Sequence, residues 1–154
     1  MPSDESHARR GAVDRGAMLD FRDTFDRMEP LATGELDDFL DPRELRIELG
    51  DGVGDAERGR FDVVWTTRDD YDVHYTDDAG RDFRWDCHPN DYPDVPGNEH
   101  FHPPPDASSD PETVEESCLR VSEIELVARA VQKLWREAYE NGAFEGINDA
   151  TGPP

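Results

Sequence analysis

The sequence predicts an α+β fold in which an antiparallel sheet of about four strands is covered by an N-terminal and a long C-terminal helix. Three observations support this fold class. Apolar residues recur at helical spacing near both ends of the chain, and four segments between them have the alternation or the β-branched and aromatic content of strands. Turn residues separate those segments. Strands joined by hairpins form a meander, and helices must then cover one of its faces.

The first predicted element is an amphipathic helix. Met18, Phe21, Phe25 and Met28 recur at steps of three and four residues, which places them on one stripe of a helix that ends before Pro30. A stripe of Met and Phe is typical of core packing. Residues 31–42 follow as a connector with one short helical turn.

The four predicted strands are residues 43–49, 60–67, 70–77 and 81–86. The first alternates charged and apolar residues, as a strand with one solvated face does. In the third, Tyr71, Val73 and Tyr75 point to one side of the sheet, and Asp72 and His74 point to the other. A tight turn at Gly80 returns the chain into the fourth strand.

The last predicted element is a helix over residues 122–141. Ser122 and Glu125 match a capping box before an apolar period, and Gly142 is a typical helix stop. Between the sheet and this helix, residues 111–116 favour a short helix and residues 118–121 favour a short edge strand.

A single α+β domain over residues 17–141 is therefore expected. Residues 1–16 mix Ser, Gly, Arg and Asp without an apolar period, which indicates a disordered head. Residues 142–154 contain Gly and Pro and indicate a flexible tail.

The composition is strongly acidic. The formal net charge is −22, and Lys133 is the only lysine in the chain. Excess carboxylate with scarce lysine keeps a protein soluble in concentrated salt, which indicates an extreme halophile. Most of these carboxylates are then expected to serve hydration rather than chemistry. Molar salt also screens the repulsion of nucleic acid, so an RNA substrate is not excluded, but its binding must rest on stacking and hydrogen bonds.

No apolar run approaches the roughly 18 residues that a membrane span needs, and the N-terminal residues contain no apolar signal segment. These observations predict a cytoplasmic protein without a membrane partner. Its two cysteines, Cys87 and Cys118, are then expected to be reduced and separate.

The residue types that perform chemistry gather in residues 73–105, which hold four of the five histidines. The second half of this stretch is rich in proline, so it forms a Pro/His-rich loop stiffened without regular hydrogen bonding. If the loop folds back over the sheet, its histidines and those of the neighbouring strands converge.

Three interpretations fit such a cluster. Two imidazoles, one neutral and one protonated, can cleave an RNA phosphodiester without a metal or other cofactor. Alternatively, Cys87, His88, His100 and His102 could hold a metal ion such as zinc, although their spacing matches no standard zinc motif. In the third interpretation the imidazoles only satisfy the irregular backbone of the loop.

The order of residues adds a family resemblance over roughly residues 43–135. It rests on His74-Tyr75, on Gly80, on Arg84-Trp85-Asp86 with His88-Pro89, and on His100-Phe101-His102. This order resembles the TumE-like family of prokaryotic toxin–antitoxin proteins. Where the family pattern has adjacent histidines, this chain has Cys87-His88.

The resemblance implies a ribonuclease-like toxin with an RNA substrate and a cognate DNA-binding antitoxin. Carried over by position, it gives the catalytic candidates His74, Asp86, His88, His100 and His102, with Arg84 as a phosphate contact. We assign the acid–base pair to His88 and His100, keep His102 as the alternate partner, and expect Asp86 to orient an imidazole. The alternative function is a non-catalytic halophilic binding module whose His/Cys loop binds a metal or a partner protein.

Overall fold

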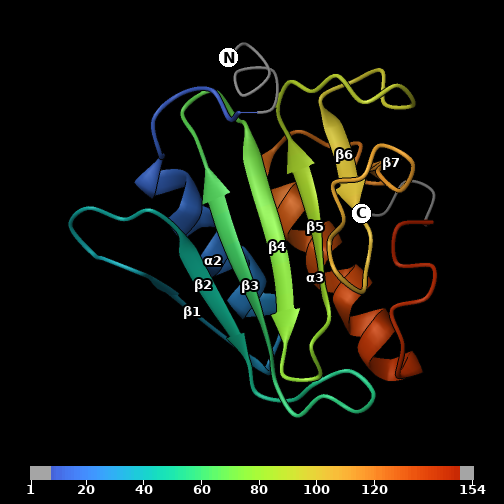
Figure 1. Ribbon diagram of the computed structural model, residues 1–154. Coiled ribbons are helices and arrows are strands. Elements are labelled where there is room, and N and C mark those ends of the chain that lie inside the picture. The colour runs from blue at the N-terminus through green and yellow to red at the C-terminus, as the bar shows by residue number, and fades with distance from the viewer. Residues whose placement is uncertain (1–7, 150–154) are drawn as a thin grey trace.

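The computed structural model describes residues 8–149. Within them the chain forms a single antiparallel sheet and two long helices (Figure 1). The elements in chain order are α2 (Arg15–Met28), β1 (Ala32–Leu36), β2 (Leu45–Leu49), β3 (Gly59–Trp65), β4 (Tyr71–Asp77), β5 (Asp82–Cys87), β6 (Glu99–His102), β7 (Glu115–Glu116) and α3 (Ile124–Asn141).

The sheet is a meander in which each strand pairs with the next one along the chain, from β1 at one edge to β7 at the other. Strands β2 to β5 are the four that the sequence predicts. The expectation of about four strands is too low, because the sheet has seven among the described residues. The three additional strands are short, and β6 fits into the Pro-rich segment because its four residues contain no proline.

Two local predictions around the end of the sheet are wrong. Residues 115 and 116 form strand β7 rather than the end of a helix, and residues 118–121 are not a strand. Helix α3 begins at Ile124, and its N-cap Glu123 makes no side-chain capping bond, so the capping box expected at Ser122 is absent. The predicted stop is confirmed: Gly142 caps the helix in the left-handed conformation.

Both helices cover the same face of the sheet (Figure 1). The core lies between these layers, because the apolar stripe of each helix meets the inward-pointing residues of the strands. Its largest buried side chains include Phe25 of α2, Trp135 of α3, and Phe83 and Trp85 of β5. The alternation of each strand therefore sends the polar residues of β4, β5 and β6 to the face that the helices leave uncovered.

The two helices are joined by a buried polar contact. The carboxylate of Glu29, which is 0% exposed, follows α2 and accepts hydrogen bonds from Gln132 and Arg136 of α3. These side chains are the partners that a buried charge requires. The contact fixes the position of one helix relative to the other.

The chain on either side of the predicted domain also contacts the sheet. Val13 pairs with Thr66, and Arg10 donates hydrogen bonds to the buried carboxylate of Asp70. At the other end, Phe144 and Ile147 are buried in the core. Parts of residues 8–16 and 142–149 therefore contact the sheet or the core, and the rest of the predicted head and tail lies outside the described residues.

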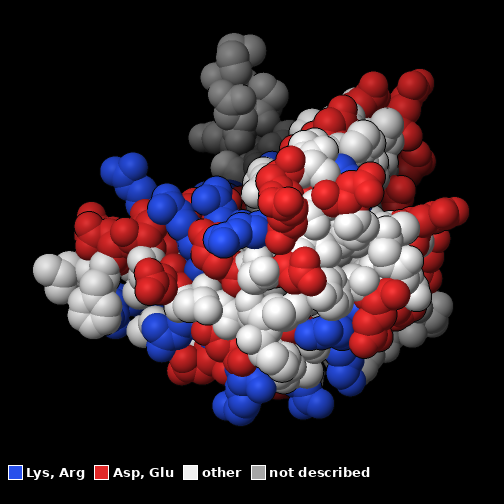
Figure 2. Space-filling view, turned by 90° about the horizontal axis from the view of Figure 1, so that it is seen from below, with Lys and Arg blue, Asp and Glu red and all other residues white. Residues whose placement is uncertain are grey.

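Acidic side chains are spread over the face seen in Figure 2, with basic side chains between them. Among residues 8–149, neither helix combines the length and the apolar character needed to cross a bilayer.

Both cysteines are free thiols. Burial raises the pKa of Cys87 to about 12 and the pKa of Cys118 to about 11. At pH 8 the thiolate fraction is then below about one in a thousand for either residue, against about one quarter for an unfolded thiol of pKa about 8.5. We expect a thiol-exchange reagent at pH 8 to modify the folded protein at least about 100-fold more slowly than the urea-unfolded protein. Equal rates would contradict the burial of both thiols, and Cys118→Ala assigns the remaining signal to Cys87.

Candidate functional site

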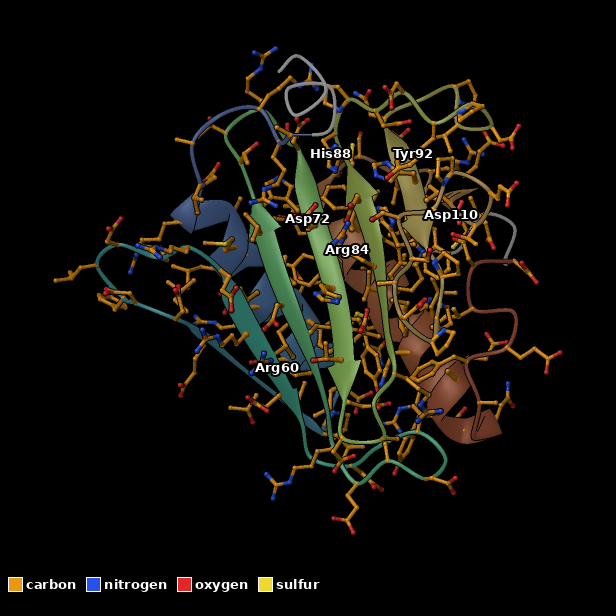
Figure 3. The ribbon with its side chains drawn as sticks, viewed as in Figure 1. Arg60, Asp72, Arg84, His88, Tyr92 and Asp110 are labelled. Atoms are coloured by element: carbon orange, nitrogen blue, oxygen red, sulfur yellow. The ribbon has the colours of Figure 1, made fainter. Side chains whose placement is uncertain are left out.

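A row of polar side chains crosses three neighbouring strands on the uncovered face of the sheet (Figure 3). In the strand register, Asp86 of β5 pairs with Asp72 of β4 on one side and with His100 of β6 on the other. Arg84 lies two residues before Asp86 on β5, on the same face, and pairs with His102. Because alternate residues of paired strands share a face, these side chains form one contiguous group.

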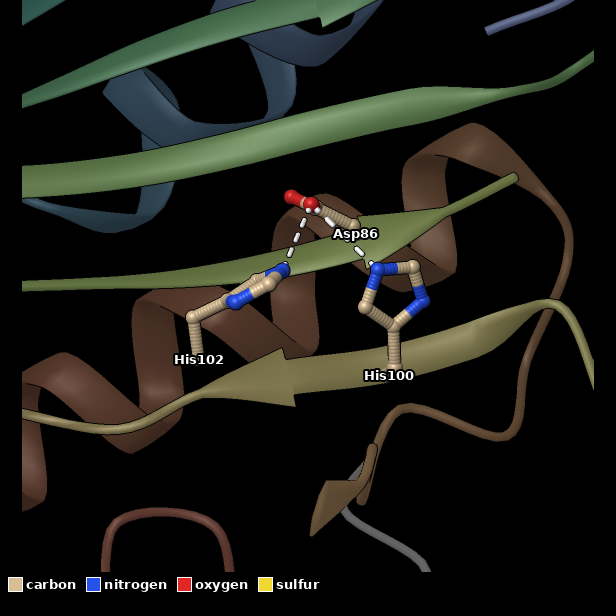
Figure 4. Close-up of side chains that lie close together, drawn as sticks. All are labelled: Asp86, His100 and His102. Carbon is tan, nitrogen blue, oxygen red and sulfur yellow. Dashed lines mark ion pairs between the residues drawn. The ribbon is translucent and has the colours of Figure 1, made fainter. Parts of the chain in front are cut away.

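Three imidazoles converge on one oxygen of Asp86. The Nε2 atoms of His102, His88 and His100 lie 3.2, 3.4 and 3.5 Å from Asp86 Oδ2. Figure 4 shows the Asp86 carboxylate between His100 and His102. All four side chains are at most 6% exposed, although helices do not cover this face. The irregular segments on either side of β6 therefore bury the cluster.

The orientation of each imidazole is fixed by its other nitrogen. The Nδ1 atoms of His88, His100 and His102 each lie 2.9 Å from a backbone carbonyl oxygen, those of Pro89, Asn98 and Ser108 respectively. A carbonyl oxygen can only accept a hydrogen bond, so each Nδ1 carries a proton and donates it. Each Nε2 therefore faces Asp86 either with a lone pair or, in the imidazolium form, with a proton.

Arg84 holds the Asp86 carboxylate from its own strand. Its Nε donates to both carboxylate oxygens, at 2.8 and 2.9 Å. Burial by itself raises the pKa of Asp86, but the imidazoles of His100, His102 and His88 and the charge of Arg84 outweigh burial and hold this pKa well below its ordinary value. Asp86 is thus a carboxylate at neutral pH.

The cluster opens into a pocket of about 350 Å³. Its lining combines the cluster with residues of the two irregular segments: Arg84, Asp86, His88, Asp91, Tyr92, Pro93, His100, His102, Ser109 and Pro111. The half-buried ring of Tyr92 stands beside two of the imidazoles, with its centroid 5.5 Å from that of His100 and 6.0 Å from that of His102. An aromatic ring at the side of a polar pocket can stack with a planar ligand group.

Two of the sequence-based candidates lie apart from the cluster. His74 shares its face of the sheet, but its Nε2 lies 3.4 Å from Asp82 rather than near Asp86. Cys87 points to the opposite face and packs against the core, so it cannot join His88, His100 and His102 around one ion. Trp85 and Phe101 are core residues and cannot stack a base.

Three residues near the cluster are not among the sequence-based candidates. Asp72 Oδ1 lies 4.0 Å from His88 Nε2, and Arg9 forms an ion pair with the same carboxylate. The alternation of β4 already places Asp72 on the face of His74, which was the available signal. Nothing in the sequence pattern indicates that Arg9, from the expected disordered head, or Tyr92, from the loop, contributes to this surface.

The comparisons with known proteins support the family resemblance that the sequence indicates. The family model described as toxin TumE matches residues 21–141, which is most of the chain and includes every residue of the Asp86 pocket. No curated protein and no solved structure matches the chain. A family model that covers the whole sheet, α3 and the second half of α2 establishes membership, and the chain therefore belongs to the TumE toxin family.

Proposed function

We propose that this toxin acts by cleaving RNA in the Asp86 pocket. The observation that carries this proposal is the convergence of three buried imidazole Nε2 atoms on Asp86 Oδ2, at the base of a pocket that Arg84 and Tyr92 also line. Burying three histidines around one carboxylate costs desolvation free energy. Such clusters of buried titratable groups are more typical of functional sites than of purely structural ones.

The cluster contains the groups that phosphodiester cleavage requires. One neutral imidazole removes the proton from the ribose 2′-hydroxyl, whose oxygen forms a bond to phosphorus. A second imidazole, protonated and stabilised by the Asp86 charge, gives its proton to the 5′-oxygen as the phosphorus–oxygen bond breaks. The products are a 2′,3′-cyclic phosphate and a 5′-hydroxyl end. Arg84 offsets the negative charge that develops on the phosphate.

We assign these two roles to His88 and His100, with His102 as the alternate partner. His88 is the most exposed of the three, at 6%, and it also faces the second carboxylate, Asp72. Tyr92 is the group best placed to stack with a base, because Trp85 and Phe101 are committed to the core.

We further propose that a DNA-binding antitoxin, encoded beside the toxin, neutralises it in the cytoplasm. Membership of a toxin family supports an antitoxin partner, and its DNA-binding nature and adjacent gene are part of the proposal. The test is expression of the chain in a halophilic host with and without the adjacent reading frame. Growth arrest that the neighbouring gene relieves supports the proposal, whereas normal growth of cells that accumulate the folded chain alone refutes it.

The RNA-cleaving activity is tested on purified protein. Wild-type protein in molar KCl is incubated with total RNA from the host, and the ends of any fragments are analysed. Fragments with cyclic phosphate and 5′-hydroxyl ends support the acid–base mechanism. Intact RNA in every condition, with and without divalent metal ions, refutes cleavage.

The charge of −22 predicts that the folded state needs salt, as expected for a protein of an extreme halophile. Between 0.1 and 1 M salt the screening length falls from about 10 to about 3 Å, so repulsion between surface carboxylates weakens in the compact state. We expect Tm to rise by about 10 °C between 0.1 and 2 M KCl, which corresponds to roughly 3 kcal/mol for a chain of this size. A Tm independent of KCl in a thermal melt would contradict this prediction.

A further inference from the structure

We propose that Asp86, His100 and His102 bind one divalent transition-metal ion, of which zinc is the natural probe. The three side chains supply one carboxylate oxygen and two imidazole nitrogens that all lie within 4.8 Å of one another. Two histidines and one carboxylate form a donor set that suits Zn²⁺, Fe²⁺ and related ions. Binding is a property of the folded chain, so it goes beyond the proposed function and holds whether or not RNA is cut.

The protons on the ring nitrogens favour a metal ion in the cluster. Each Nδ1 proton is committed to a backbone carbonyl, so a neutral imidazole directs a lone pair toward Asp86. Asp86 Oδ2 already accepts a hydrogen bond from Arg84, and one carboxylate oxygen cannot accept three more from three imidazolium ions. Without a metal ion between them, any imidazole that stays neutral therefore directs its lone pair at the lone pairs of Asp86 in a buried site.

The Nε2 atom of His100 is buried and unsatisfied within residues 8–149. His100 is 0% exposed, and among the described residues its Nε2 has no hydrogen-bond partner. Leaving a buried nitrogen without a partner costs about 1–3 kcal/mol. A metal ion bound by this Nε2 removes that cost, and it also separates Nε2 from the oxygen of Asp86.

The distances fit a metal ion. His102 Nε2 and His100 Nε2 lie 3.2 and 3.5 Å from Asp86 Oδ2, which is long for hydrogen bonds to a carboxylate. A tetrahedron with metal–ligand bonds of about 2.0–2.1 Å has ligand–ligand edges of about 3.3–3.4 Å. Two of the three ligand–ligand separations are therefore close to the edges of a tetrahedral site.

The surroundings hold these ligands as metal sites usually do. Ligating histidines commonly donate their second ring N–H to a carbonyl, as His100 and His102 do to Asn98 and Ser108. Arg84 fixes the plane of the carboxylate. The adjoining pocket leaves room for a fourth ligand, either water or a phosphate oxygen.

This ligand set differs from the zinc site considered on sequence grounds, because Asp86 takes the place of Cys87. It also separates two chemical states of the pocket. In the metal-free state three imidazoles are available for proton transfer, and in the loaded state only His88, which lies outside the three-ligand group, remains available.

Metal binding by purified protein tests the proposal. Chelator-treated protein in molar KCl with excess Mg²⁺, which occupies surface carboxylates, is titrated with Zn²⁺ and with Co²⁺. We expect one equivalent of Zn²⁺ to bind and to raise Tm, and Co²⁺ to give the intense visible absorption of a tetrahedral site.

The variants His100→Asn and Asp86→Asn should each weaken Zn²⁺ binding at least about 100-fold and abolish the Tm increase. Asparagine at position 100 preserves a donor near the Nδ1 position, and circular dichroism of the chelated proteins verifies folding. His74→Asn removes an imidazole from the same face of the sheet and should leave affinity unchanged. Stoichiometry below about 0.1, or equal affinity in His100→Asn and wild type, overturns the proposal.

Discussion

Replacing His100 with asparagine should lower the rate of RNA cleavage by about 100-fold or more, because a positioned acid–base group typically contributes 10²–10⁴-fold. The substitution is selective. The asparagine amide can still donate to the Asn98 carbonyl in place of Nδ1, but it has no atom at the position of Nε2, which lies 3.5 Å from Asp86. The measurement is the cleavage rate of one labelled RNA in molar KCl.

The same substitution at other histidines defines the extent of the site. His102→Asn keeps the contact to the Ser108 carbonyl and should lose less activity than His100→Asn, because His102 is the alternate partner. His74→Asn should reduce the rate much less, since the imidazole of His74 lies against Asp82 rather than Asp86. Cleavage by His100→Asn at the wild-type rate, with an unchanged Tm, would exclude His100 from proton transfer.

Replacing Arg136 with alanine should reduce the free energy of unfolding by about 3 kcal/mol, the largest stability effect that we expect from a polar substitution. Its guanidinium donates to both oxygens of Glu29, which is 0% exposed, and its loss leaves that carboxylate buried with only Gln132 as a side-chain donor. The measurement is urea unfolding at constant KCl concentration.

Two further variants separate this contact from a general loss of charge. Arg129 is exposed on the same helix, and Arg129→Ala should change the free energy of unfolding by less than about 0.5 kcal/mol. The double variant Glu29→Gln, Arg136→Ala should recover part of the loss, because no charge is then left buried. Equal effects of Arg136→Ala and Arg129→Ala would show that the buried pair does not join the helices.

The sequence predicted the regular part of this fold because its signals are local. The alternation of β2 to β5, the stripe of α2 and the glycine after α3 each reflect a period or a backbone conformation within a few residues. Strands β1 and β7 carry no such signal, and the alternation in β6 is only four residues long within the Pro-rich segment. These three strands owe their structure to pairing with the neighbouring strand.

The candidate site was predictable in its residue types and only partly in its arrangement. Alternation places Asp86 and His88, and likewise His100 and His102, on common faces of extended segments, and the structure brings these four together. Alternation also excludes Cys87 from the site, because Cys87 follows Asp86 by one residue and therefore points to the opposite face of the sheet. The separation of His74, the approach of Arg9 and the position of Tyr92 depend on register and loop paths that no local pattern encodes.

The central claim is that the toxin acts through the cluster around Asp86, and growth arrest by the variant Asp86→Asn tests it most directly. Asparagine has the size of aspartate but lacks the charge that three imidazoles and Arg84 surround. At expression levels matched to wild type, and with folding confirmed by its Tm, Asp86→Asn should allow normal growth of a halophilic host that the wild-type chain arrests. Arrest as complete as that caused by the wild type would contradict the claim.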